Sequence, residues 1–391
     1  MRLLRRPTSA FSRHVLNDLS AFLTSSVRPI PGETRERAKA AVEWICRAQD
    51  ATADNGVSLG YFPCDEPSGW RASYPETSGY VIVSLLEFAK RFGDNGALER
   101  ALRIAWWEIR IQMPSGGVQG GPVCPRERQS PCAFNTGMVL DGWSTAYRTS
   151  GDRAFLEAGR RAAAFLVSDL TSEGYFRTNG QFVTAGEIKT YNCLCAWSLY
   201  RIGDDTGQDS YRSAAVRVIE AALRQKQASG WFANNCLTRP DAPLLHTIGY
   251  TLQGILEVGI LTNRQDFVTA VEVPVQALLS RMSPRGFLHG RFYANWEPAS
   301  FWSCLTGSAQ LAIVCYRLFE FTGSRQYWEG AERLLNYLKA LQAVDSLEPC
   351  INGALAGSFP ILGGYMTAGY PNWATKYLLD ALMLQDRLRA R

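Results

Sequence analysis

The sequence predicts an all-α protein built as an (α/α)6 toroid, in which six helical hairpins form an inner and an outer ring of helices. Two spacings predict this fold. Threonines that open apolar stretches recur every 54 to 59 residues, at Thr77, Thr136, Thr190, Thr247 and Thr306. Glycine–hydrophobic pairs share this period, at Gly60-Tyr61, Gly117-Val118, Gly174-Tyr175, Gly230-Trp231 and Gly286-Phe287. Self-similarity of this kind indicates one repeated supersecondary unit.

A further set of glycines predicts where the helices that follow the threonines end. One glycine comes after each apolar stretch, at Gly93, Gly151, Gly203, Gly259 and Gly323. Glycine is favoured just past a helix C-terminus because it adopts the left-handed conformation at little cost. Each unit is therefore expected to contain a Thr-led helix, a short turn, a second helix and a long loop.

The Thr-led helices are expected to form the inner ring. Stretches such as 137–147 and 307–316 are mostly small or apolar, and a helix that is apolar on every side is buried on every side. In chain order, the inner helices are expected near residues 77–91, 136–149, 190–202, 247–258, 305–321 and 373–388.

The second helices carry more charge and are expected to form the outer ring. Arg212, Arg217, Glu220 and Arg224 give one of them a polar face. In chain order, the outer helices are expected near residues 34–50, 96–112, 153–170, 209–228, 264–281 and 325–342. An open solenoid of the tetratricopeptide type is the alternative. Its units are shorter, at about 34 residues, and it lacks long loops between hairpins, so the toroid is favoured.

Composition and charge limit the domain organisation and the partners. No domain boundary is visible, so residues 1–30 are expected to form an N-terminal arm or extra helix and residues 31–391 a single toroid. Apolar residues make up 46% of the chain and charged residues 20%, which suits a packed core. The formal net charge is only +5, and no block of Lys and Arg lies in the folded region. Binding to nucleic acid is therefore not expected.

The sequence also predicts a cytoplasmic protein without a metal or a cofactor. Residues 1–6 are basic, but the residues that follow lack the continuous apolar run of a secretory signal or a membrane span. The ten cysteines form no CxxC pair and are expected to be reduced. The three histidines form no HExxH motif, so a zinc site is not expected. The oligomeric state is not predicted.

The residues just before the threonines are the candidate catalytic groups. All the long loops lead into inner helices, so they gather at the N-terminal end of the inner ring, where helix dipoles are positive. A ring would bring Glu76, Asn135, Lys189 and His246 to this end. Glu76 is a candidate acid or base, His246 a candidate proton carrier because imidazole titrates near neutral pH, and Asn135 an orienting group. Lys189 would neutralise a carboxylate or pair with Glu187, which is itself a candidate second carboxylate.

Aromatic and basic residues on the same loops form the candidate substrate-binding set. Aromatic rings would stack on a sugar ring, and the forked donors of arginine would hold a carboxylate. Besides Asn135, this set comprises Trp70, Arg71, Trp231, Arg239, Arg291, Tyr293, Trp302, Tyr370 and Asn372. The expected partner is a carbohydrate, either anionic or linked to a lipid.

The hairpin number, the period and the loop placement resemble the six-hairpin glycosidase-like superfamily. Its members include N-acylglucosamine 2-epimerases, unsaturated glucuronyl hydrolases and toroidal polysaccharide lyases. Three segments are also similar to sugar-processing proteins of bacterial polysaccharide synthesis, namely Tyr74-Pro75-Glu76-Thr77-Ser78-Gly79-Tyr80, His246-Thr247-Ile248-Gly249-Tyr250 and Tyr370-Pro371-Asn372-Trp373. The epimerases exchange a proton between two inner-helix histidines, whereas this sequence has only His246 in such a place and His289 in a loop. The lyases use an Asn, a His or Tyr, and an Arg.

Three functions are compatible with these observations. The first is an epimerase or lyase that abstracts a proton from a sugar or a uronate-containing glycan, in polysaccharide biosynthesis. The second is a glycoside hydrolase with a carboxylate pair, Glu76 with Glu187 or Glu297. The third is a cyclase of the isoprenoid or terpenoid type, or a non-catalytic glycan-binding toroid. The cyclase is disfavoured because no DxDD-type motif is present.

Overall fold

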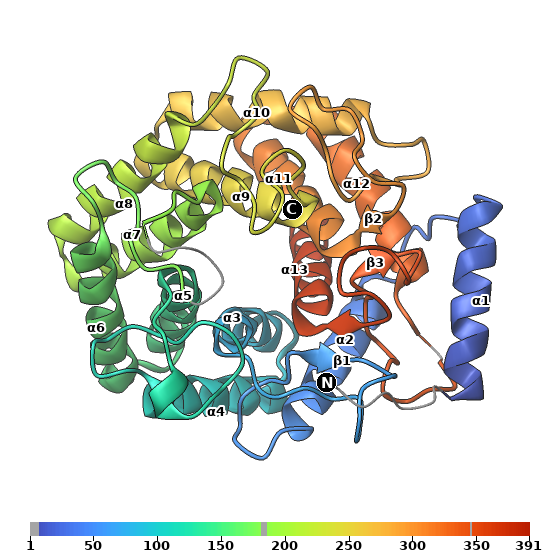
Figure 1. The fold of residues 1–391 in the computed structure, drawn as a ribbon, viewed down its shortest axis with the longest axis horizontal. Helices are drawn as coiled ribbons and strands as arrows, with labels where there is room; N and C mark the ends of the chain where they lie inside the picture. Colours follow the sequence, from blue (N-terminus) through green and yellow to red (C-terminus); the bar gives the residue numbers. More distant parts are fainter. Residues whose placement is uncertain (1–7, 181–185, 345) are drawn as a thin grey trace.

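The computed structural model describes residues 8–180, 186–344 and 346–391. Within these residues, twelve α-helices from α2 to α13 form six hairpins around a common axis, and α1 (Ser9–Leu23) precedes them. Viewed down the axis, the inner and outer helices form two concentric rings (Figure 1). The predicted all-α toroid is confirmed.

The helices alternate between the rings along the chain, as predicted. The outer helices are α2 (Thr34–Asp50), α4 (Asn95–Ile111), α6 (Arg153–Asp169), α8 (Asp209–Leu223), α10 (Gln265–Ser280) and α12 (Arg325–Leu341). The inner helices are α3 (Pro75–Phe92), α5 (Ala133–Ser150), α7 (Leu194–Thr206), α9 (Leu245–Thr262), α11 (Leu305–Thr322) and α13 (Asn372–Arg389). Two short 3-10 helices, η1 (Arg126–Arg128) and η2 (Thr190–Cys193), lie in the loops.

The inner helices are buried on every side, which explains their low charge. All residues of α5 from 133 to 146 are buried, as are those of α9 from 245 to 259. The outer helices bury one face only; in α6, buried residues such as Phe155 and Ala162 alternate with exposed ones such as Arg153 and Glu157. The sequence pattern therefore separates the two rings correctly.

The recurrent threonines lie at the start of the inner helices, with Thr190 in η2, and most of them bond to a loop. The N-cap residues themselves, such as Tyr74 and Cys132, make no side-chain capping bond. Instead, Thr136 Oγ1 accepts a hydrogen bond of 2.9 Å from the backbone N–H of Val118, in the preceding loop. Thr375 makes the same bond from α13 and is the sixth member of the series, which the spacing did not reveal.

The predicted helix ends are correct for three helices and one turn too early for two. Glycine adopts the left-handed conformation at the C-cap of α3, α5 and α11, at Gly93, Gly151 and Gly323. The helices α7 and α9 continue past Gly203 and Gly259, to Gly207 and Asn263. A Cβ atom at Gly259 would lie 2.9 Å from Phe267 Cβ in α10. These two glycines therefore let the helices of one hairpin approach each other.

The glycines of the long loops have a common packing role. Each has a φ between 82° and 104° and lies against the outer helix of the next hairpin, at Gly116, Gly174, Gly230 and Gly286. A Cβ atom at Gly174 would lie 2.6 Å from the Arg217 carbonyl oxygen in α8. In the second repeat the equivalent residue is Gly116 rather than the predicted Gly117. Gly60 has a different role, because it belongs to a strand.

The ring closes where the last inner helix meets the first hairpin. The helix α13 packs on α2, α3 and α11. Strand β1 (Gly60–Tyr61) pairs with β4 (Tyr370–Pro371), and β2 (Ser303–Cys304) pairs with β3 (Ser358–Phe359), both antiparallel. Across this seam, Asn372 Nδ2 donates to Ser58 O at 2.8 Å and to Thr77 Oγ1 at 2.7 Å. A closed ring excludes the open solenoid.

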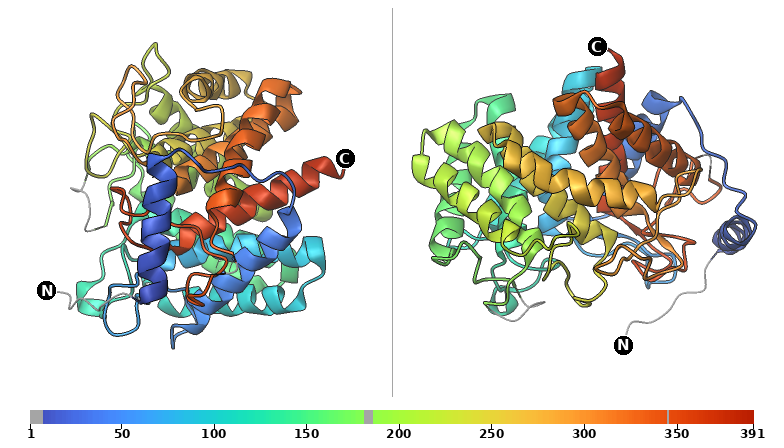
Figure 2. Two further views of the ribbon diagram at one scale, coloured as in Figure 1. Left: turned by 90° about the vertical axis from the view of Figure 1, so that its right-hand side faces the viewer. Right: turned by 90° about the horizontal axis from the view of Figure 1, so that it is seen from above.

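The first helix, α1, lies outside the two rings, beside the loops that precede α11 and α13 (Figure 2). Phe22 on α1 contacts Phe287 and Phe359 in these loops, with ring centroids 6.2 Å and 5.7 Å apart. In the part of the chain that the structure describes, no helix has the length and apolarity needed to cross a membrane.

Candidate active site

A cavity of about 150 Å³ opens at the N-terminal end of the inner ring. Its walls come from the first turns of the inner helices and from the loops that lead into them. Among the described residues, its polar lining comprises Tyr74, Glu76, Asn135, Asn179, Tyr191, His246, Thr247, Tyr250 and Tyr365. Its apolar lining comprises Cys132, Phe134, Leu237, Leu244, Met366 and Trp373. Three of the four predicted ring residues, Glu76, Asn135 and His246, therefore meet in one cavity.

Glu76 is a carboxyl group held close to neutral pH by its surroundings. It is the second residue of α3, and Pro75 before it fixes the start of the helix. Burial raises the pKa of Glu76 from 4.5 to about 7, because an apolar environment penalises the carboxylate. A hydrogen bond with Tyr74 opposes this rise only in part. At neutral pH the group therefore exists in both protonation states, as general acid–base catalysis requires.

His246 is held as a neutral imidazole. Its Nδ1 atom lies 2.8 Å from Gln310 Oε1, an acceptor on α11, so Nδ1 carries the proton and Nε2 is left as a base. Burial lowers the pKa of His246 to about 4, although the bond to Gln310 opposes the shift. The ring packs on Tyr250 one helical turn later, with centroids 4.3 Å apart.

Tyrosine and asparagine side chains complete the polar lining. Tyr365 Oη accepts a hydrogen bond of 2.8 Å from Trp373 Nε1, which orients both aromatic rings on the wall. Asn135 donates one of its amide hydrogens to Gln119 O at 2.9 Å, and the second hydrogen is left for a ligand. Burial raises the pKa of the Cys132 thiol to about 12, so this cysteine stays protonated and does not supply a nucleophile.

The predicted second carboxylate and the predicted cation lie outside the cavity. Lys189 is buried as the N-cap of η2, and its Nζ atom lies 2.7 Å from Glu187 Oε1. Glu187 is exposed, and Glu297 forms an ion pair of 2.6 Å with Arg281 on an outer loop. Glu76 is thus the single acidic side chain among the described residues that line the cavity, and no Lys or Arg is among them.

The remaining residues of the predicted substrate-binding set pack the loops instead of lining the cavity. Trp70 contacts Trp44 and Tyr61, and Trp231 contacts Trp296. Arg71 binds Asp65 at 2.7 Å, Arg239 binds Asp241 at 2.8 Å, and Arg291 donates to Ala242 O at 2.7 Å. Trp302 packs against Gly290 and Gly364, Tyr370 is in β4, and Asn372 binds across the seam. Tyr293 is 43% exposed.

Several lining residues were not predicted, although their spacing from His246 or from a recurrent threonine would have found two of them. Tyr250 lies four residues after His246, one turn along the same face of α9. In the third hairpin the inner helix starts with the 3-10 turn η2, so Tyr191, just after the threonine, faces the cavity in place of Lys189. Met366 and Leu237 come from loops, where the sequence carries no periodic signal.

Comparison with known proteins finds similar folds but no similar sequences. No family model and no curated protein matches this sequence. An unsaturated glucuronyl hydrolase specific for heparin matches with a TM-score of 0.72 at 15% identity, over 92% of this chain and 98% of that chain. The unsaturated glucuronyl hydrolase from Bacillus sp. GL1 matches with a TM-score of 0.72 at 15% identity, over 90% and 97%.

A third solved structure has a different activity but the same architecture. The cellobiose 2-epimerase from Bacillus thermoamylovorans B4167 matches with a TM-score of 0.68 at 11% identity, over 96% of this chain and 99% of that chain. The fold is the (α/α)6 toroid that these three structures share. At such identities the likeness is one of fold, and it supports the predicted resemblance at that level. The reaction has to be argued from the cavity.

Proposed function

We propose that the protein is a carbohydrate-active enzyme that moves a proton at a sugar carbon, as an epimerase does. The observation that carries this proposal is the cavity itself, which holds one carboxyl group with a pKa of about 7 and one neutral imidazole. A carboxyl group that is partly protonated at neutral pH and an imidazole that is unprotonated there form an acid–base pair suited to proton transfer.

In this mechanism the base is His246 Nε2, which takes the proton from a carbon next to the carbonyl of an open-chain sugar. Glu76, in its protonated form, donates a proton to the carbonyl oxygen or returns one to the opposite face of the carbon. Negative charge develops on the substrate oxygen in between. The N-termini of the inner helices point toward the cavity and stabilise such charge.

The lining favours an uncharged sugar over a uronate. A uronate would bring its carboxylate into a cavity whose described lining contains Glu76 and no Lys or Arg. The hydroxyl and amide groups of Tyr74, Asn135 and Tyr191 suit sugar hydroxyls, and the rings of Phe134 and Trp373 offer apolar faces for stacking. This narrows the substrate class expected from the sequence, and a role in polysaccharide biosynthesis remains part of the proposal.

A hydrolase with a carboxylate pair has less support. Such an enzyme needs two carboxyl groups on either side of the scissile bond, at most about 10 Å apart. Glu187 and Glu297, the predicted partners of Glu76, face solvent and are paired with Lys189 and Arg281. The proposal therefore assigns Glu76 the role of a general acid or base, without a second carboxylate.

The test is incubation of the purified protein in heavy water with neutral aldoses, N-acylamino sugars and uronates, followed by NMR and mass spectrometry. We expect deuterium at the carbon next to the carbonyl of a neutral sugar. Glu76→Gln and His246→Gln should each lower the exchange rate by about 10²-fold or more, whereas Glu187→Gln should retain it. Cleavage with addition of water, no carbon-bound deuterium and loss of activity in Glu187→Gln would instead establish a carboxylate-pair hydrolase.

A further inference from the structure

The most exposed large apolar side chains of the described structure gather at one place. Their exposed fractions run from 82% to 47%, in the order Leu347, Leu23, Phe301, Leu16 and Leu362. Leu16 and Leu23 are on α1. Since isolated exposed apolar residues are common on soluble proteins, only their concentration in one region is informative.

The other three residues belong to segments that contact α1. Phe301 lies beside Phe22, with ring centroids 6.3 Å apart. Leu347 precedes Glu348, whose carboxylate accepts a hydrogen bond of 2.9 Å from Thr8 Oγ1 at the start of α1. Leu362 follows Ile361, whose backbone N–H donates to Asp18 at 2.6 Å. The five apolar side chains therefore lie on α1 or on segments that contact it.

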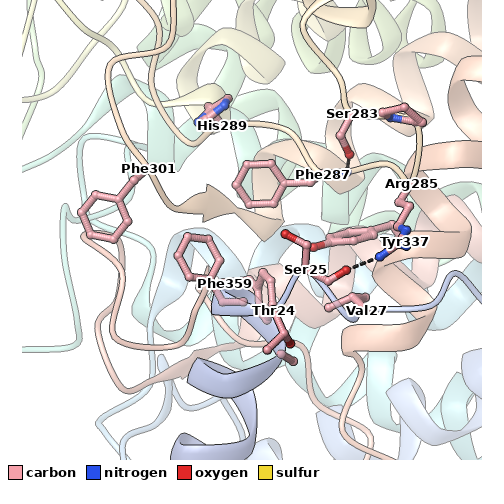
Figure 3. A pocket seen from close by; sticks show the side chains of 13 residues that line it. Thr24, Ser25, Val27, Ser283, Arg285, Phe287, His289, Phe301, Tyr337 and Phe359 are labelled. Carbon is pink, nitrogen blue, oxygen red and sulfur yellow. Dashed lines mark hydrogen bonds between the residues drawn. The ribbon is translucent and has the colours of Figure 1, made fainter.

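A groove of about 540 Å³ opens next to this apolar region, between the C-terminal end of α1 and the loops before α11 and α13. Figure 3 shows the rings of Phe287, Phe301, Phe359 and Tyr337 around it, with Arg285 at one edge donating to the Ser25 carbonyl oxygen. The groove shares no lining residue with the cavity that holds Glu76. It is a separate site, and five of its thirteen lining residues are Phe or Tyr.

Exposed basic side chains of the described structure lie at the same place. Of the five arginines in residues 1–30, the structure describes Arg13 and Arg28, and the segment contains one aspartate. The one aspartate, Asp18, is bound to the backbone of Ile361. Arg13 and Arg28 are exposed on either side of the apolar residues, and Arg285 is exposed at the groove. A surface with this charge complements an anionic partner.

We propose that α1 and the rim of the groove bind the surface of a bilayer that contains anionic phospholipid, with one hydrocarbon chain in the groove. Helices that lie on membranes combine apolar side chains with flanking basic residues, as this region does. Each basic residue near an anionic leaflet adds attraction, and burial of leucine and phenylalanine side chains in the lipid adds more. The proposal is independent of the reaction at Glu76, so either can fail alone.

The test is sedimentation of the full-length protein with vesicles of phosphatidylcholine, or of an equal mixture of phosphatidylcholine and phosphatidylglycerol. We expect binding to the mixed vesicles, weakening as salt is added. The double variant Leu23→Ser, Phe301→Ser should bind at least about tenfold more weakly, since both side chains leave water on binding. Both are largely exposed, so the fold should be kept, which thermal unfolding would check.

The matched control is the double variant Leu261→Ser, Phe321→Ser, which removes two exposed apolar side chains at the C-terminal ends of α9 and α11. It should bind the mixed vesicles as the unmodified protein does. Equal binding by Leu23→Ser, Phe301→Ser, or no binding of the unmodified protein to mixed vesicles, would overturn the proposal. The proposal would also be overturned if sedimentation velocity showed a dimer that the Leu23→Ser, Phe301→Ser variant abolishes, since a second copy of the protein would then cover the surface.

Discussion

At the scale of single residues, one apolar environment acts in opposite directions on the two groups that matter most. Desolvation disfavours the charged form of every group, so it raises the pKa of Glu76 and lowers that of His246. The carboxyl group is thereby brought to neutral pH, and the imidazole is kept unprotonated there. Neither effect requires a charged partner, and the described lining offers no Lys or Arg to either group.

The raised pKa of Glu76 predicts a pH-dependent stability. Between the unfolded value of 4.5 and the folded value of about 7, the folded state binds more protons, so its stability falls as the pH rises through this range. Glu76→Gln removes this loss. Above about pH 7 the variant should be more stable than the unmodified protein by roughly 1 to 3 kcal/mol, and below about pH 4 the difference should vanish. Urea unfolding at several pH values measures this difference in the free energy of unfolding. A difference that does not vary with pH would show that the pKa of Glu76 is not raised in the folded protein.

Which site residues the sequence could predict depended on their position in the repeat. Glu76, Asn135 and His246 precede the repeated threonines, and the ring geometry brings these positions to one cavity. Trp231 and Arg71 have suitable chemistry, but they are used to pack loops against each other. A sequence shows that an aromatic or basic residue is in a loop, but not which side of the loop faces the cavity.

At the scale of elements, the threonines and glycines that recur in the sequence make contacts between neighbouring helices and loops. Four threonine hydroxyls, those of Thr136, Thr190, Thr247 and Thr375, bind loops to inner helices, and the loop glycines let the next outer helix approach. The period was therefore visible because most units make these two kinds of contact. The helix ends at Gly207 and Asn263 were missed because Gly203 and Gly259, inside the helices, serve a packing contact that looks like an end signal.

The hydrogen bonds of the threonine hydroxyls predict a difference in stability between two chemically identical substitutions. Thr136→Val should cost about 1 to 3 kcal/mol, because it leaves the buried N–H of Val118 without an acceptor. Thr306 is equally buried, but its hydroxyl has no partner among the described residues. Thr306→Val should therefore be neutral or slightly stabilising. Chemical unfolding of both variants tests this, and equal losses would contradict the role given to the hydroxyl.

The loop glycines predict a second contrast, between two positions that both have positive φ. Gly151, at the end of α5, has a φ of 73° and open space around its Cα, whereas Gly174 has a φ of 90° and lies against α8. Alanine is strained at both positions, but only at Gly174 would it also collide with backbone. Gly174→Ala should cost about 2 kcal/mol more than Gly151→Ala in thermal unfolding. Similar costs would show that backbone conformation alone selects glycine there.

At the scale of the whole molecule, closure of the ring distinguishes this fold from an open array of hairpins. The helix α13 completes the inner ring by packing on both α11 and α3, while α2 covers it from outside. Strand pairing of β1 with β4 and the bonds of Asn372 fix the same seam. Every hairpin therefore has a neighbour on both sides, and the ring has no free end at which unfolding could begin.

Closure predicts that the two ends of the chain contribute differently to folding. A chain without residues 1–30 keeps all twelve helices of the rings and should unfold in one cooperative transition, with coincident far-UV circular dichroism and tryptophan fluorescence. A chain without residues 370–391 loses β4 and α13 and leaves apolar faces of α2, α3 and α11 uncovered. It should lack a cooperative transition and aggregate. If instead the first truncation abolished cooperative unfolding, α1 would belong to the core of the toroid, and the division at residue 30 would be wrong.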